Sequence, residues 1–257
     1  MYYSYYFSAQ INDRFIVSNI DDQQFNMIIA SRDKMNCVLY QIDYFTMLYM
    51  NYLSFVDAYN TVSAFDSLQF VKYNALYINF LNGYYTWWEF VKNHNLCNEE
   101  INLIINSYKD IKTCKYVHRF RNYSVHSSQI IKNLDVDLLD NIKSLNIDIE
   151  GVINDNNTGR NLADMLLEDA SIEAGSFALE GLKVLNDMMH DVYLSEKSYL
   201  DDAVKYIGRF LPKDSVEKYN TVICSDDQTD VLPIGWFLKL FDEKIKIYNR
   251  IFGTSIS

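Results

Sequence analysis

The chain has 257 residues, 49% of them apolar and 15% aromatic, which is enough to bury a sizeable core in one large domain or two small ones. Its net charge of −11 counts against a broad nucleic-acid surface, so any RNA binding would depend on a local basic patch. No apolar run reaches about 18 residues, and the N-terminus lacks the basic region of a secretion signal, so we expect neither a membrane span nor export.

The four cysteines and four histidines are scattered, without the spacing of a zinc site. We therefore expect reduced thiols in a cytoplasmic protein, with no metal and no cofactor. Only 8 Gly and 2 Pro interrupt the chain, which predicts long elements and an all-α fold with room for one short β-hairpin or strand pair. We expect an N-terminal segment over 1–22, a helical bundle over 23–150 and a C-terminal helical region over 151–257 packed on the bundle.

The N-terminal segment is aromatic and β-branched, with Asn12 and Asp13 as a turn candidate, and it predicts a short hairpin or a single added strand. Asp21 and Asp22 place acids where a helix begins. One long helix is predicted from Gln23 to about Thr61. Its apolar positions recur at spacings of three, four or seven: Ile28, Met35, Val38, Ile42, Phe45, Tyr49, Tyr52 and Val56.

A second helix is predicted to about Asn93, capped by Asp66 or Ser67. The residues that mark its buried face are Val71, Ala75, Ile78, Tyr85 and Trp88. The aromatic cluster from Tyr84 to Trp88 could stack nucleic-acid bases, but core packing or a dimer contact is the favoured interpretation because the cluster wraps around the helix.

Asn98 caps a predicted third helix, and the stretch Lys109 to Ser128 contains no Gly or Pro, so a helix can run through it. The segment after His126 would complete a four-helix bundle. Further along, Asp135 to Ile149 alternates acids with Leu, Val and Ile, a pattern that fits a short helix or a strand. The clearest loop, and the best boundary, is Asn154 to Gly159.

Beyond that loop the sequence returns to helical periodicity. Helices are predicted over Asn161–Ala170, Phe177–Glu196, Leu200–Phe210 and Ile234–Phe252, with Pro212 ending the third and Pro233 starting the last. Tyr219 to Cys224 is the best strand of the second half, and it could pair with the N-terminal segment.

The stretch from Lys109 to Ser128 holds two of the four histidines and a run of positive charge inside an acidic protein. On a helix, each residue turns about 100°, so Asn122 and His126 lie one above the other on the same face. Lys115 and Arg119 fall on nearly the same face, and Arg121 lies one position round from Asn122. The spacing predicts one polar stripe of cation, amide and imidazole.

Such a stripe suits chemistry on a phosphodiester. An imidazole titrates near neutral pH and can take or give a proton, and a guanidinium stabilises charge that develops on a phosphate. On RNA the 2′-OH is a built-in nucleophile, so the site needs no metal. Chance alone also places Arg and His at this spacing, and a solvated helix face is the alternative interpretation.

The hexapeptide Arg121-Asn122-Tyr123-Ser124-Val125-His126 resembles the Arg-x4–6-His motif of the HEPN superfamily. The surrounding sequence is similar to uncharacterised bacterial HEPN-like proteins over roughly residues 25 to 130. The features that carry this likeness are Asn79-Phe80-Leu81, the pair Trp88-Glu89, and the Tyr-rich helix Tyr116 to Phe120.

The resemblance implies a metal-independent ribonuclease in a toxin or antiphage-defence system, acting as a homodimer and controlled by an antitoxin or another defence partner. It implies Arg121, Asn122 and His126 as catalytic residues. We expect Lys115, Arg119 and Tyr123 to bind the RNA, and Glu89 either to support Arg121 or His126 or to lie on the surface. Some relatives carry a Tyr two residues after the His, which a nucleotidyltransferase modifies; Ser128 stands there, so that control is not supported.

Two other classes of function are compatible with the sequence. One is a catalytically silent HEPN-like helical module that binds a partner protein. The other is a helical regulator that holds a small ligand between its helices, which the 21 Tyr and 15 Phe allow without specifying it. The presence of all three motif residues favours the ribonuclease.

Overall fold

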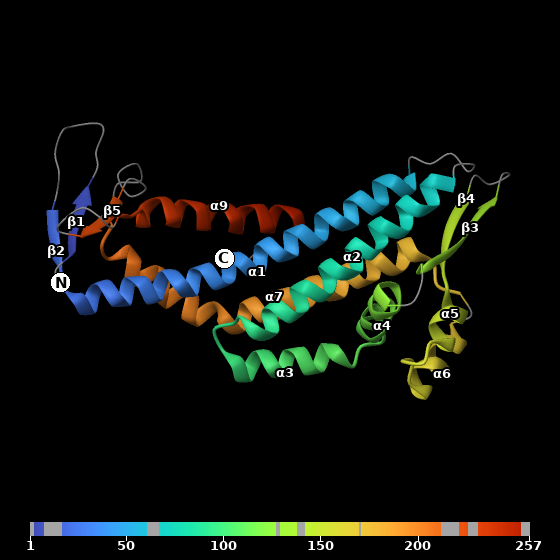
Figure 1. Cartoon of the computed structure of the whole chain (residues 1–257). Helices are drawn as coiled ribbons and strands as arrows, with labels where there is room; N and C mark the ends of the chain where they lie inside the picture. Colours follow the sequence, from blue (N-terminus) through green and yellow to red (C-terminus); the bar gives the residue numbers. More distant parts are fainter. Residues whose placement is uncertain are drawn as a thin grey trace. The chain divides into compact units, whose positions relative to one another are not determined.

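A computed structural model of the chain describes residues 3–7, 17–60, 67–126, 129–137, 142–169, 171–211, 221–225 and 231–252 (Figure 1). Helices make up most of these ranges, which confirms the mainly helical fold. The helices are α1 (Asp22–Asn60), α2 (Ser67–Asn93), α3 (Asn98–Lys109), α4 (Lys112–His126), α5 (Ile149–Asn154), α6 (Arg160–Glu168), α7 (Ala174–Gly208) and α9 (Ile234–Phe252). The strands are β1 (Tyr3–Phe7), β2 (Val17–Ile20), β3 (Ile131–Asp137), β4 (Ile142–Ile147), β5 (Thr221–Ser225) and β6 (Val231–Leu232). Several predicted turn, cap, end and control positions lie outside the described residues: Asn12, Asp13, Thr61, Asp66, Ser128 and Pro212.

The chain divides into two compact units built from discontinuous segments. Unit 1 contains residues 1–42, 95–97 and 193–257, and unit 2 contains 43–94 and 98–192. Helices α1 and α7 each contribute to both units. The limits predicted from the sequence, after residues 22 and 150, are contiguous and divide the chain differently.

Unit 1 combines a small antiparallel sheet with helical segments. The strand order is β2-β1-β5-β6, and Tyr3 of β1 pairs with Ser225 of β5 (Figure 1). This confirms that the N-terminal segment pairs with the strand predicted near residues 219–224. The start of α1 is also as predicted, because the Asp21 carboxylate accepts from the Gln24 N–H at 2.7 Å while the Gln24 side chain accepts from the Asp21 N–H at 3.0 Å.

The core of unit 2 is largely aromatic. On α2 the fully buried residues follow helical spacing: Tyr73, Tyr77, Phe80, Tyr84 and Trp87. The predicted buried face of this helix was therefore wrong, since Val71 is 54% exposed and Ala75 is exposed as well. Only Trp88 of that predicted set is buried. By contrast, the first five predicted positions of α1, Ile28 to Phe45, are all buried.

The segment after α4 forms a β-hairpin rather than a fourth bundle helix, which corrects the prediction. Strands β3 and β4 pair antiparallel, with Leu134 opposite Leu145 (Figure 1). The buried Asn74 of α2 holds the start of β3: its side chain accepts from the Ile131 N–H at 2.9 Å and donates to the Ile131 carbonyl at 3.1 Å. An amide that satisfies both backbone groups of one residue fixes an extended chain at this point. Of the two structures that the alternating acids and aliphatic residues allowed here, a short helix or a strand, the chain forms strands.

Candidate functional site

Helix α4 carries the sequence motif and lies against α2, α3 and α5 in unit 2. One side of the helix is buried, through Cys114, Val117, Phe120 and Tyr123. Because these apolar residues recur every three residues, the helix is fixed in rotation and its polar residues are directed to defined surroundings. Each residue of the predicted polar stripe therefore has a fixed position in unit 2.

Arg121 is held in a defined orientation at the surface of unit 2. Its guanidinium carbon lies 4.4 Å from the centre of the Tyr85 ring, its Nε donates to Asn82 Oδ1 at 3.3 Å, and its Nη1 donates to Asn122 Oδ1 at 3.1 Å. Its Nη2 amino group makes no hydrogen bond to any described residue. A guanidinium that is stacked and hydrogen-bonded on one side, with donors remaining on the other, is preorganised to receive an anion.

His126 is the last residue of α4, and its side chain is exposed. Among the described residues nothing forms a hydrogen bond with its imidazole, and no ion pair or hydrogen bond joins it to Arg121. The geometry therefore leaves the His126 ring accessible to a substrate or to a second chain. Asn122, one turn before it, is also exposed but is already hydrogen-bonded to Arg121.

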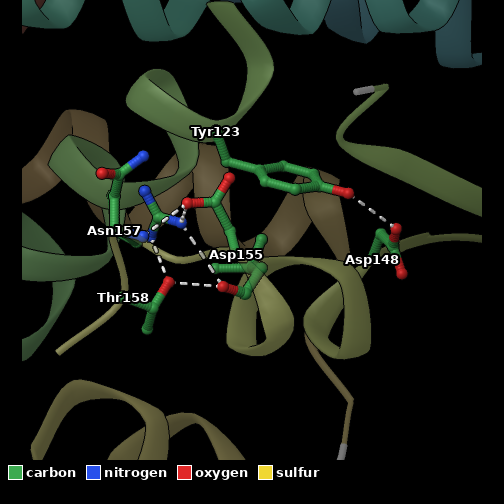
Figure 2. A network of polar contacts seen from close by, with 7 residues as sticks. Tyr123, Asp148, Asp155, Asn157 and Thr158 are labelled. Atoms are coloured by element: carbon green, nitrogen blue, oxygen red, sulfur yellow. Dashed lines mark hydrogen bonds and ion pairs between the residues drawn. The ribbon is translucent and has the colours of Figure 1, made fainter. Parts of the chain in front are cut away.

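Arg119 was expected to guide RNA, and the structure places its side chain in the largely buried part of unit 2. Its side chain is 6% exposed, and its Nη2 lies 2.7 Å from Asp155 Oδ1, a carboxylate that is 10% exposed. The guanidinium also donates to Thr158 Oγ1 and to the Val152 carbonyl. These partners come from the end of α5 and the loop after it, and Figure 2 shows the side chains of Asp155 and Thr158 close together there. The arginine ties α4 to that loop, and it also forms part of the wall of a cavity in unit 2.

Tyr123 was also expected to bind the RNA, and the structure directs its side chain into unit 2. It is 5% exposed, and its hydroxyl donates to Asp148 Oδ2 at 3.1 Å (Figure 2). Asp148 caps α5 by accepting from the Gly151 N–H at 3.1 Å. A side chain at position 151 would collide with this pair, because a Cβ there would lie 2.3 Å from the Tyr123 hydroxyl.

The two remaining predicted residues, Lys115 and Glu89, both line one cavity of unit 2. Lys115 Nζ lies 3.3 Å from Asp110 Oδ1, and Glu89 Oε1 lies 3.7 Å from Lys92 Nζ. Glu89 therefore pairs with a lysine of its own helix and forms no ion pair with Arg121 or His126 among the described residues. Its carboxylate instead acts electrostatically on a different imidazole, that of His118.

The cavity has a volume of about 660 Å³ and is formed by α2, α3, α4 and α6. His118 lies on its wall, with its ring perpendicular to the rings of Tyr85 and Trp88 at centroid distances of 5.6 and 5.0 Å. Burial lowers the pKa of His118, and although Glu89 opposes this, nearby cations including Arg121 lower it further. Its surroundings therefore favour the neutral form of the imidazole.

His118 is the residue that the sequence reasoning missed. Lys115, His118 and Asn122 stand at positions i, i+3 and i+7 of α4, which is the spacing of one helix face. That signal was present in the sequence. The stripe was instead predicted to run through Arg119, which lies one residue further on and is buried.

Comparison with protein-family models, with curated proteins and with solved structures finds no match to this chain. In the described ranges, no group of three or more His, Cys, Asp or Glu side chains is placed to hold a metal ion. A search of the described helices for a stretch with the length and hydropathy of a membrane span finds none.

Proposed function

We propose that the protein is a metal-independent endoribonuclease of the HEPN type, which cuts single-stranded RNA in a toxin or antiphage-defence role. The observation that carries the proposal is the setting of Arg121. Its guanidinium is stacked on Tyr85 and hydrogen-bonded to Asn82 and Asn122, while Nη2 makes no hydrogen bond to any described residue. His126 is exposed five residues further along the same helix. An oriented cation and an accessible imidazole on one helix support chemistry at a phosphodiester.

In the proposed reaction His126 removes the proton from a 2′-OH, and the 2′-oxygen attacks the adjacent phosphorus. The bond to the 5′-oxygen breaks, and that oxygen takes up a proton from an acid. Arg121 binds the phosphate and stabilises its developing charge. The products are a strand that ends in a 2′,3′-cyclic phosphate and a strand that begins with a 5′-OH. Water then converts the cyclic phosphate to a 3′-phosphate.

The reaction needs an acid as well as a base, and a single imidazole cannot easily serve as both in one in-line step. We propose that a homodimer brings together two copies of the Arg121–His126 segment, so that one His126 acts as the base and the other as the acid. The exposure of His126 at the end of α4 leaves it accessible to a second chain. An antitoxin or another defence partner would control this assembly.

A second candidate is a catalytically silent helical module that binds a partner protein. Exposed apolar side chains at helical spacing on the part of α1 that belongs to unit 2 favour it, namely Met47 at 60%, Met50 at 55% and Leu53 at 38%. Flexible methionines on a helix surface are typical of protein-binding faces. The two candidates differ in whether the protein cleaves RNA, and the ribonuclease candidate further requires that the cleavage depends on His126.

The test compares RNA cleavage in the presence of a chelator by the wild-type protein, His126→Ala and His94→Ala. His94 is an exposed histidine elsewhere in unit 2 and serves as the matched control. We expect cleavage by the wild type and His94→Ala, no cleavage by His126→Ala, and no cleavage of DNA of the same sequence. Equal cleavage by all three proteins would assign the activity to something other than this site. Absence of cleavage by the purified dimer would favour the partner-binding module.

A further inference from the structure

The cavity around His118 is an anion-attracting site inside an acidic chain. Three lysines line it, Lys92, Lys109 and Lys115, against two acids, Glu89 and Asp110, whereas the whole chain has a net charge of −11. Arg119 lines it as well, but its guanidinium is paired with Asp155. Lys92 and Lys115 each lie near one of these acids. Lys109 forms no ion pair with any described residue, so it places an uncompensated positive charge at the cavity.

The same cavity offers aromatic and amide groups. Tyr85 and Trp88 supply ring surface, and His118 stands edge-on to both. The Nε2 atom of His118 is buried without a hydrogen-bond partner among the described residues, so the other ring nitrogen, Nδ1, is the one available to a ligand. Four asparagine side chains, which can both donate and accept, complete the polar lining: Asn102, Asn106, Asn122 and Asn161.

The volume fits the ligand that these groups would select. Small-molecule sites typically enclose about 300–1,000 Å³, and this cavity has about 660 Å³. A planar heterocycle can stack on aromatic side chains, its edge can bond to amides and to a neutral imidazole, and an attached phosphate is attracted by the lysines. A nucleotide unit combines these three properties.

The cavity is also continuous with the proposed catalytic face. Tyr85 lines the cavity and carries the Arg121 guanidinium on its ring at 4.4 Å. Asn122 lines the cavity and accepts the hydrogen bond from Arg121 Nη1. A strand whose base occupies the cavity would therefore place a neighbouring phosphate at Arg121.

His118 and His126 lie eight residues apart on α4, which corresponds to about 12 Å along the helix axis. At this separation the two imidazoles lie about two helical turns apart on α4. His118 is therefore suited to binding a nucleotide beside the cleavage position, not to transferring the proton there.

We propose that the cavity binds one unpaired nucleotide of the RNA strand, with its base against Tyr85 and Trp88 and a phosphate drawn by Lys109 and Lys115. This inference rests on the proposed function, because it assigns the cavity to the same substrate. It makes the enzyme selective for strands with an unstacked base at one fixed position relative to the cut.

The test measures binding of a fluorescently labelled, single-stranded oligoribonucleotide of mixed sequence by anisotropy, in the His126→Ala background so that cleavage cannot interfere. Asn106→Trp fills the cavity from an exposed position on α3, and Leu103→Trp adds the same bulk at a residue that is 71% exposed on the same helix and outside the cavity. We expect Asn106→Trp to weaken binding on the order of tenfold and Leu103→Trp to leave it unchanged. Equal affinity of the two variants would overturn the proposal.

Two further arms identify what the cavity recognises. An abasic strand of the same length should bind equally well to His126→Ala and to His126→Ala combined with Asn106→Trp, because it has no base that could enter the cavity. Adenosine 5′-monophosphate should displace the labelled strand, whereas ribose 5-phosphate should not. Displacement by both compounds would show an anion site without base recognition and would contradict the proposal.

A charge pair of variants provides the second control. Lys109→Glu should weaken binding, whereas Lys72→Glu, the same change at an exposed position on α2 outside the cavity, should weaken it far less. Strand binding that depends on Asn106 and Lys109, combined with no cleavage by the wild type, would leave the cavity proposal standing and reject the ribonuclease. Cleavage by the wild type together with unaffected binding in both cavity variants would support the ribonuclease and reject the cavity proposal.

Discussion

Arg119 and Arg121 lie two positions apart on α4 and occupy opposite environments. Arg119 is 6% exposed and forms a 2.7 Å ion pair with the nearly buried Asp155. Arg121 rests on the outer ring of Tyr85, with Nη2 available beyond its bonds to Asn82 and Asn122. Arginine therefore stabilises the fold at position 119 and offers a binding group at position 121. The residues that the fold places beside each arginine determine which of these roles it has.

The largest effect is expected from replacing the buried arginine. Arg119→Met keeps much of the side-chain volume but leaves Asp155 buried without its cation, which typically costs about 3–5 kcal/mol. Arg121→Met should change the free energy of unfolding by about 1 kcal/mol or less. Urea denaturation followed by circular dichroism checks both values, and Arg119→Met combined with Asp155→Asn should recover much of the loss. Similar destabilisation by the two single variants would contradict the conclusion that Arg119 stabilises the fold far more than Arg121 does.

Glu196 differs from Arg119, because it is a buried ionisable group that forms no ion pair with any described residue. Its Oε1 accepts from the Leu96 N–H at 2.7 Å and from Gln41 Nε2 at 3.2 Å, while its Oε2 is buried with no hydrogen-bond partner among the described residues. Burial raises the pKa of Glu196 to about 7, although these two hydrogen bonds lower it. The folded protein therefore holds a proton that the unfolded chain releases near pH 4.5.

The sign of the pH dependence follows from that difference. Between about pH 4.5 and 7 the folded state binds more protons than the unfolded state, so the contribution of Glu196 to stability falls as the pH rises, by about 3 kcal/mol in total. Glu196→Gln should remove this loss and be more stable than the wild type at pH 8, with little difference at pH 4.5. Urea midpoints measured at both pH values provide the check. An unchanged difference between the two proteins at the two pH values would contradict the assignment.

A smaller effect is expected at Tyr123. Tyr123→Phe removes the hydrogen bond to Asp148, which retains the Gly151 N–H and Lys132 Nζ at 3.3 Å. The expected loss of stability is about 1 kcal/mol. Because the hydroxyl is directed into the structure, RNA affinity measured by anisotropy should be unchanged. A loss of affinity at constant stability would restore Tyr123 to the RNA-binding residues.

The smallest effect is expected at Lys115, a partly exposed cation that forms an ion pair with Asp110. Lys115→Ala should weaken RNA binding only a few-fold and reduce the slope of log affinity against log salt concentration by about 0.7, the value for one single-strand phosphate contact. Lys72→Ala serves as the control for loss of a surface lysine elsewhere. An unchanged salt slope for Lys115→Ala would remove this residue from the binding face.

The sequence predicted the parts of the fold that local pattern determines. The buried residues of α1 from Ile28 to Phe45 follow the helical period closely, and the Asp21 cap depends on neighbours only three residues away. The strand near residue 221 was found from its composition. These features need no knowledge of distant residues, which explains why they could be predicted.

The errors share one physical cause, which is dependence on distant partners. The face of α2 was misplaced because the burial of its tyrosines depends on other elements, as the contact between the rings of Tyr77 and Phe55 of α1 shows. The hairpin after α4 depends on Asn74, which lies 57 residues before Ile131. Local spacing alone does not contain such pairings.

The candidate site shows the same division. The spacing predicted a polar face on α4, and Lys115, Asn122 and Arg121 do lie at the surface of unit 2. The spacing could not predict that Arg119 would form an ion pair with Asp155. Nor could it predict that three aromatic rings of α2 would pack against His118. Both outcomes follow from loops and helices that are remote in the sequence.

The most direct test of the central claim uses a DNA strand that contains a single ribonucleotide, incubated with the purified protein in a chelator. The account predicts one cut, immediately 3′ of the ribonucleotide, which leaves a 2′,3′-cyclic phosphate, and it predicts that Arg121→Ala slows this cut by about 10²–10³. Cutting at deoxyribonucleotides, a requirement for added Mg²⁺, or an undiminished rate in Arg121→Ala would contradict the assignment of Arg121 to phosphate stabilisation in a 2′-OH mechanism.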